Sequence, residues 1–144
     1  MEEPIFNTVA EGFEEFGKVS PPGFRGPDQF IDLMSGKCPE IDPWMWLLEL
    51  KDLSEFWATY FRKQFPYLVL VPFAKNEFSD DVYCFAGNDR SGDPAVLIIH
   101  GFTTPGWEFR GMWRSFSDWY LDAQEQHVAW LRDREDVAIS GDSE

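Results

Sequence analysis

Basic residues are scarce in this sequence. Twelve lysines and arginines face 26 aspartates and glutamates, which gives a formal net charge of -14 over 144 residues. Because the chain has no basic patch, we expect it to bind neither nucleic acid nor an anionic membrane. A negative field of this size speeds encounter with cationic partners, although high net charge also serves solubility alone.

Cysteines and long apolar runs are scarce too. Cys38 and Cys84 lie far apart and belong to no CxxC or CxxH motif, which favours reduced thiols over a zinc site or a disulfide framework, with one long-range disulfide as the alternative. The acidic N-terminus is followed by no apolar run, and the best apolar stretch, 67–74, is too short to span a bilayer. We therefore expect a cytoplasmic protein.

Motifs for catalysis are absent: the chain contains no G-x-S-x-G, Walker A, G-x-G-x-x-G or H-E-x-x-H pattern. His100 and His127 have no ligand spacing around them, which favours structural roles over zinc binding. Asp80 and Asp81, near Glu77, could act as acid and base or hold a cation, but a solvated turn is the favoured interpretation. We predict no enzyme, no metal and no cofactor, with a carboxylate-dependent hydrolase as the weaker alternative.

Aromatic residues, in contrast, are abundant: the chain holds 14 Phe, 7 Trp and 4 Tyr. Such side chains bury large areas, and at 144 residues the chain is long enough for one domain with a substantial core. Aromatic side chains are also the usual anchors of binding surfaces. Composition alone does not separate these two uses.

The first 43 residues hold six of the ten prolines and five glycines, so long regular elements are not expected there. We interpret 1–43 as an ordered wrapping segment with short helices near 8–16 and 28–35. The second helix would have Asp28 as its N-cap and end at Gly36. Its phenylalanines need a core to be buried in, so the segment belongs to the same domain as the rest.

Residues 44–135 form the predicted α+β core, and 136–144 an acidic tail that we expect to fray. A strand or buried turn at 44–48 leads into a helix capped by Asp52 or Ser54, on which apolar residues recur at helical spacing up to about residue 62. Strands are predicted at 67–74, 81–86, 95–100 and 107–113, and a last helix begins at Ser115. The residues of 81–86 alternate, which predicts Cys84 in the core and Tyr83 on the opposite face of the sheet. We expect an antiparallel or mixed sheet of four to six strands with helices packed on it.

Four segments carry a resemblance to a known family. They are an apolar strand ending in Pro-Phe, an acidic turn with an aromatic strand, a short strand after proline, and a Ser-Phe that opens the last helix. In this order and spacing the chain resembles the SUKH superfamily, which includes bacterial toxin-immunity proteins and a fungal cell-wall regulator. The residues that match the family motif are Pro72, Phe73, Asp81, Tyr83, Phe85, Pro94, Val96, Ser115, Phe116 and Trp119.

The resemblance implies binding without catalysis, by an immunity protein that neutralises a toxin. Many such toxins are basic where they bind nucleic acid, so the implied partner is a basic toxin domain bound by a monomer or weak homo-oligomer. A regulatory or scaffold module, as in the fungal branch, is the alternative. The candidate contact residues are acidic residues on loops and two tryptophans, for which a place in the core is the favoured interpretation: Glu77, Asp80, Asp81, Asp89, Asp93, Trp107 and Trp113.

Overall fold

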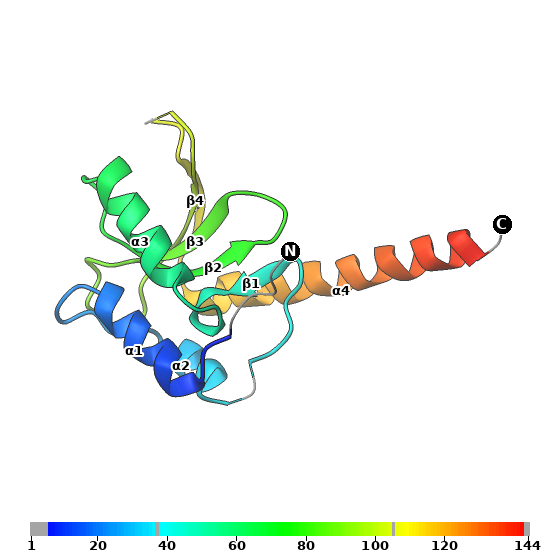
Figure 1. The fold of residues 1–144 in the computed structure, drawn as a ribbon, viewed down its shortest axis with the longest axis horizontal. Helices are drawn as coiled ribbons and strands as arrows, with labels where there is room; N and C mark the ends of the chain where they lie inside the picture. The colour runs from blue at the N-terminus through cyan, green and yellow to red at the C-terminus, as the bar shows by residue number, and fades with distance from the viewer. Residues whose placement is uncertain (1–5, 37, 105, 143–144) are drawn as a thin grey trace.

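The computed structural model describes residues 6–36, 38–104 and 106–142, the last seven by their backbone only. The predicted α+β fold is confirmed, with a single sheet of five antiparallel strands in the order β1-β2-β3-β4-β5 (Figure 1). The elements are α1 (Val9–Val19), α2 (Asp28–Ser35), β1 (Trp44–Trp46), the 3-10 helix η1 (Leu47–Glu49), α3 (Leu53–Gln64), β2 (Leu70–Asn76), β3 (Asp81–Ala86), β4 (Val96–His100), β5 (Phe109–Trp113) and α4 (Phe116–Asp142).

Strand β1 is short and covers only part of its neighbour. It pairs with Ala74, Lys75 and Asn76 of β2, so no strand in the described part of the chain pairs with the first half of β2 on that side. Pro72, which lacks a backbone donor, lies in this uncovered half, and the β2–β3 register shifts between Pro72 and Ala74. A proline is tolerated there because it removes no ladder hydrogen bond.

Helices cover both faces of the sheet. On one face α3 packs over a small cluster that includes Val82, Cys84 and Ile99. On the other face α1, α2 and α4 enclose a larger core that includes Tyr83 and Phe85. The alternation of β3 is therefore as predicted, with Cys84 in the core. In Figure 1 the second half of α4 continues away from the body of the molecule.

The N-terminal segment supplies part of the larger core. Phe30 of α2 is fully buried, and Phe16 of α1 is 7% exposed. Helix α1 begins with a capping box, in which the Glu11 amide donates to the Thr8 hydroxyl and the Thr8 amide donates to the Glu11 carboxylate. Hydrogen bonding from Thr8 lowers the pKa of Glu11. The proline- and glycine-rich segment is thus ordered against the sheet.

Several predicted boundaries differ from the structure. Pro27, not Asp28, is the N-cap of α2, because proline suits the helix entrance and Asp28 is already helical. Strand β2 begins at Leu70 because a turn, in which the Leu68 amide donates to the Phe65 carbonyl, precedes it. Strand β5 begins at Phe109, after a turn closed by the Trp107 amide.

Helix α4 continues to Asp142 and so includes most of the tail 136–144 for which fraying is expected, whose last two residues lie outside the described part of the chain. No proline or glycine interrupts 116–140, so nothing local ends α4 earlier. At its start, the Asp118 amide donates to the Ser115 hydroxyl, as the capping pattern predicted. No helix in the described part of the chain is both long and apolar enough to cross a membrane.

Candidate protein-binding site

The five acidic residues predicted as contacts do not share one surface. Glu77 and Asp80 lie in the β2–β3 turn, and Asp81 is the first residue of β3. Asp89 and Asp93 lie in the β3–β4 connection, at the opposite end of these strands. Sequence reasoning placed all five at strand ends but could not say which end, and the structure divides them between the two ends of β3.

Asp81 pairs with His100, a contact that sequence reasoning missed. The Asp81 Oδ1 and His100 Nδ1 atoms are 2.8 Å apart, and both side chains are about one-third exposed or less. The two residues stand directly opposite each other in the β3–β4 register. The available signal was that the predicted strands 81–86 and 95–100 follow each other: if they form one hairpin, residue 81 comes opposite residue 100. The contact ties the two strand ends together next to the β2–β3 turn.

The two candidate tryptophans separate clearly. Trp113 packs against the larger core, with its ring 6.0 Å from that of Tyr83. Trp107 is 72% exposed in the β4–β5 connection. The favoured core interpretation is therefore wrong for Trp107, which stands where a partner can reach it.

Large apolar side chains are exposed on α3, on the turn before β2 and on the β4–β5 hairpin, which carries Trp107. All but the half-buried Tyr60 are at least half exposed. We call this surface the aromatic face, and its members are Phe56, Tyr60, Tyr67, Phe102, Trp107, Phe109 and Met112.

The hairpin register explains how β5 joins this surface. Phe109 stands opposite Ile99, and Met112 stands opposite Leu97. Directly paired residues share a face of the sheet, and Ile99 and Leu97 face the α3 side. Phe109 and Met112 therefore project on the α3 side, beyond the strands that α3 covers, and each is 56% exposed.

Phe102 is held in place in the β4–β5 connection, two residues after the end of β4. Its backbone is left-handed, with φ of 54°, which is costly for a bulky side chain. Its amide donates to the Tyr60 hydroxyl at 2.6 Å, and the two rings are 4.7 Å apart. A Cβ at the preceding Gly101 would lie 2.7 Å from the Trp57 ring, so the close approach needs glycine. These constraints keep the Phe102 ring outward, at 60% exposure.

A phenol–carboxylate contact fixes the other end of the aromatic face. The Tyr67 hydroxyl donates to the Glu108 carboxylate, which also accepts from the Gly106 amide at 3.0 Å. The hydrogen bond from Tyr67 lowers the pKa of Glu108 and raises the pKa of Tyr67. Tyr67 thus remains a donor and Glu108 an acceptor at neutral pH, and the residue next to Trp107 is anchored.

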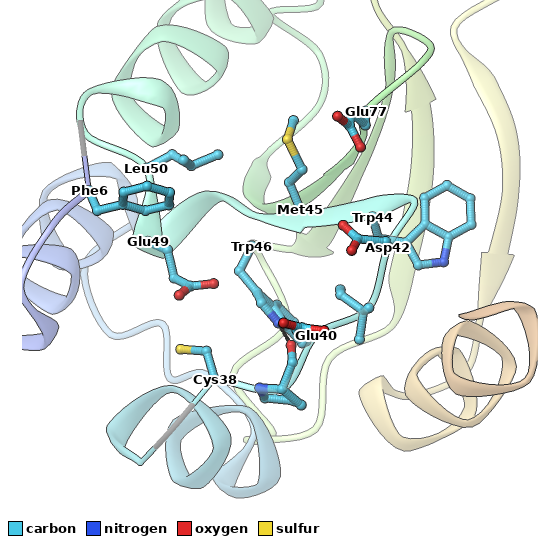
Figure 2. A pocket seen from close by; sticks show the side chains of 12 residues that line it. Phe6, Cys38, Glu40, Asp42, Trp44, Met45, Trp46, Glu49, Leu50 and Glu77 are labelled. Carbon is cyan, nitrogen blue, oxygen red and sulfur yellow. Dashed lines mark hydrogen bonds between the residues drawn. The ribbon is translucent and has the colours of Figure 1, made fainter. Parts of the chain in front are cut away.

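A second surface feature, the acidic groove, follows the outer edge of β1. It has a volume of about 390 Å³ and is lined by four carboxylates with apolar residues between them (Figure 2). The carboxylates are Glu40, Asp42, Glu49 and Glu77. No lysine or arginine is among the lining residues that the structure describes. The sequence did not predict this groove, because its walls come from three stretches that lie apart in the sequence: Phe6, 38–50 and Glu77.

Burial and charge shape the chemistry of the groove. Burial raises the pKa of Glu49, and burial together with the Glu49 charge raises the pKa of Cys38 to about 11. Cys38 and Cys84 are both free, which rules out the alternative of a disulfide between them. With its pKa near 11 the Cys38 thiol stays protonated at neutral pH, so it is a poor nucleophile. The groove is suited to binding positive charge, not to thiol chemistry.

Glu49→Gln is expected to raise the melting temperature at pH 7.5. The raised pKa of Glu49 means that its ionised form is disfavoured in the folded state, a cost fully present above the folded pKa and relieved as pH falls through it. The gain should therefore shrink towards pH 4. Thermal unfolding of both proteins between these pH values measures it, and a gain that grows on acidification would contradict the assignment.

The groove carboxylates are spread along the strand instead of converging on a point. Among residues 6–36, 38–104 and 106–142, no three His, Cys, Asp or Glu side chains are grouped as metal ligands. Spread carboxylates suit an extended ligand with several positive charges.

Comparison of the chain with protein-family models, curated proteins and solved structures finds no match.

Proposed function

We propose that this chain is a non-catalytic protein-binding domain that acts as an immunity protein, neutralising a basic toxin domain by binding it. The observation that carries the proposal is the aromatic face. Monomeric proteins seldom leave so many large apolar side chains exposed together, and such patches mark interaction sites. Trp and Tyr are prominent among the residues that dominate binding energy at interfaces.

The aromatic face is also held in a defined conformation before any partner arrives. The left-handed Phe102 backbone, the Tyr60 hydrogen bond and the Tyr67–Glu108 contact each fix part of it. A preorganised surface loses less conformational entropy on association, which favours affinity. Immunity against a toxin requires such affinity, because unbound toxin continues to act.

The net charge of -14 supports a basic partner. Long-range attraction raises the association rate with a cationic domain, and the effect is screened by salt. The toxin's own phosphate-binding surface is the kind of cationic surface that an acidic protein would compete for. The family resemblance in the β2 to α4 region points in the same direction.

A regulatory or scaffold module is the second candidate, and the outer half of α4 favours it. In Figure 1 this half continues beyond the body of the molecule; Leu131 on it is 43% exposed, and Val128, just before it, is 47% exposed. A scaffold could use this helix and the aromatic face for different partners. Recovery of several cellular partners, with no protection against any toxin, would favour this candidate.

Trp107→Ala is expected to abolish or strongly reduce protection. The test is co-expression of the full chain with the toxin domain encoded beside its gene, followed by growth measurement and isolation of the complex. With the unaltered chain we expect rescued growth, and a complex that weakens as the salt concentration rises from about 50 to about 500 mM. Loss of the Trp107 ring should weaken binding by roughly tenfold or more.

Phe78→Ala is the matched control, because Phe78 is also 72% exposed but lies in the β2–β3 turn, outside the aromatic face. It should leave binding unchanged. If the two variants behaved alike, the aromatic face would not be the binding site. Absence of both complex and protection would remove the immunity function itself.

A further inference from the structure

The outer edge of β1 has backbone groups available for pairing. The Glu77 amide donates to the Pro43 carbonyl at 2.8 Å, and Pro43 precedes the ladder in which Met45 stands opposite Lys75. Hydrogen-bonded pairs alternate along an antiparallel ladder, so Met45 turns its amide and carbonyl towards β2. The backbone groups of Trp44 and Trp46 consequently point outward, into the acidic groove.

Two of these outward groups are already used locally. The Trp44 amide donates to the Ile41 carbonyl at 2.9 Å. Trp46 is the N-cap of η1, a position whose carbonyl accepts the first bond of the helix. Among the described residues this leaves the Trp44 carbonyl and the Trp46 amide without a partner, one acceptor and one donor on either side of Met45. One residue of an added strand can satisfy both, as in a parallel ladder.

Just beyond η1, the backbone of the N-terminal segment already pairs with the chain that follows β1. Phe6 forms an isolated antiparallel bridge with Leu50, and the Asn7 amide donates to the Glu49 carbonyl at 2.8 Å. Phe6 lines the end of the acidic groove. Backbone pairing along this edge is therefore sterically accessible, and the groove continues it along β1.

Carboxylates flank β1 on both sides. Figure 2 shows Glu77 beside Met45 on one side of the β1 ribbon, and Glu40 and Glu49 on the other. The side chains of an added strand alternate between the same two sides. Positive side chains at either set of alternate positions would thus find a carboxylate, while negative ones would be repelled.

We infer that the acidic groove binds an extended, lysine- or arginine-rich segment of the partner protein by strand addition to β1. The inference rests on the proposed function, since it takes the ligand to be a protein. Main-chain hydrogen bonds to the Trp44 carbonyl and the Trp46 amide fix the segment in register, and the four groove carboxylates select for positive charge. This mode needs no match to a folded partner surface, only an accessible basic strand or tail.

The test uses the full chain and a synthetic eight-residue peptide of alternating lysine and threonine. We expect saturable binding, and slower hydrogen exchange at the Trp46 amide in the complex. The same peptide with every backbone amide methylated keeps the charge but cannot pair as a strand, and should bind roughly tenfold more weakly or not at all. Equal binding of both peptides, or unchanged exchange at Trp46, would overturn strand addition.

The double variant Glu40→Lys and Glu77→Lys tests the groove. Both side chains are exposed, so folding should be retained, and binding should fall by roughly tenfold or more. The control, Asp93→Lys with Glu125→Lys, changes the net charge equally at exposed sites that do not line the groove. An equal loss in both variants would mean attraction by overall charge alone, against the inference.

Failure here is distinguishable from failure of the immunity function. The peptide experiment needs no toxin, and the protection experiment needs no peptide. Peptide binding without protection would retain the groove and remove the immunity role. Protection without peptide binding would retain the immunity role and overturn the groove.

Discussion

Replacing Phe30 with alanine is expected to lower the free energy of unfolding by about 3–5 kcal/mol. Phe30 is fully buried. Solvent therefore cannot replace the contacts that are lost when the ring is removed. Its ring lies within 6.3 Å of five others, those of Phe16, Trp46, Phe73, Phe85 and Phe116. A loss of this size is a large part of the typical 5–15 kcal/mol that holds a domain folded.

Chemical denaturation followed by tryptophan fluorescence measures this loss. Phe78→Ala serves as the control, since the same substitution at a 72% exposed position should change stability by no more than about 0.5 kcal/mol. A small effect at Phe30 would mean that α2 is dispensable to the core. The 1–43 segment would then be an appendage to the sheet, contrary to the packing described above.

Gly12→Ala is expected to destabilise the protein by about 1–3 kcal/mol, although alanine is the better helix former. Gly12 lies in α1 where the helix meets η1. A Cβ there would clash with the Leu48 side chain and lie 2.5 Å from the Leu48 carbonyl oxygen. The backbone oxygen cannot move aside as a flexible side chain would, so the two elements must separate.

Gly17→Ala provides the matched comparison within the same helix. A Cβ at Gly17 meets nothing within 4 Å, so only the helix propensity changes, and stability should rise by about 1 kcal/mol. Urea unfolding of both variants should therefore give opposite signs. Stabilisation by both substitutions would show that η1 yields to α1 at no cost, which contradicts the close contact at Leu48.

Most elements of the fold could be predicted from local sequence. The alternation of β3 placed Cys84 and Tyr83 on opposite faces correctly, because side-chain direction in a strand depends only on the backbone period. Ser115 was recognised as a cap because capping is a contact between near neighbours. The predicted starts of β2 and β5 were less accurate, since a turn closed by a hydrogen bond to the Phe65 carbonyl precedes β2 and one closed by a hydrogen bond to the Thr104 carbonyl precedes β5.

The candidate site was less predictable. The apolar stripe of α3 includes Phe56, Trp57 and Tyr60, and periodicity assigned all of them to one apolar side of a helix. In the structure Trp57 is 3% exposed and Phe56 is 50% exposed. The available signal was the width of the apolar stripe, which is greater than one buried helix face. The width indicates that some ring must stay exposed, but not which one.

The sequence by itself determined the charge, the kinds of element and their order along the chain. These follow from composition and from periods of two to four residues, which act within a single segment. Only the tertiary structure decided that Trp107 is exposed while Trp113 is packed, and that Asp81 meets His100. Likewise, Glu40 and Glu77 come to line one groove only because their segments pack on the two sides of β1. Exposure and electrostatic grouping depend on which segments pack together, and that is a property of the whole fold.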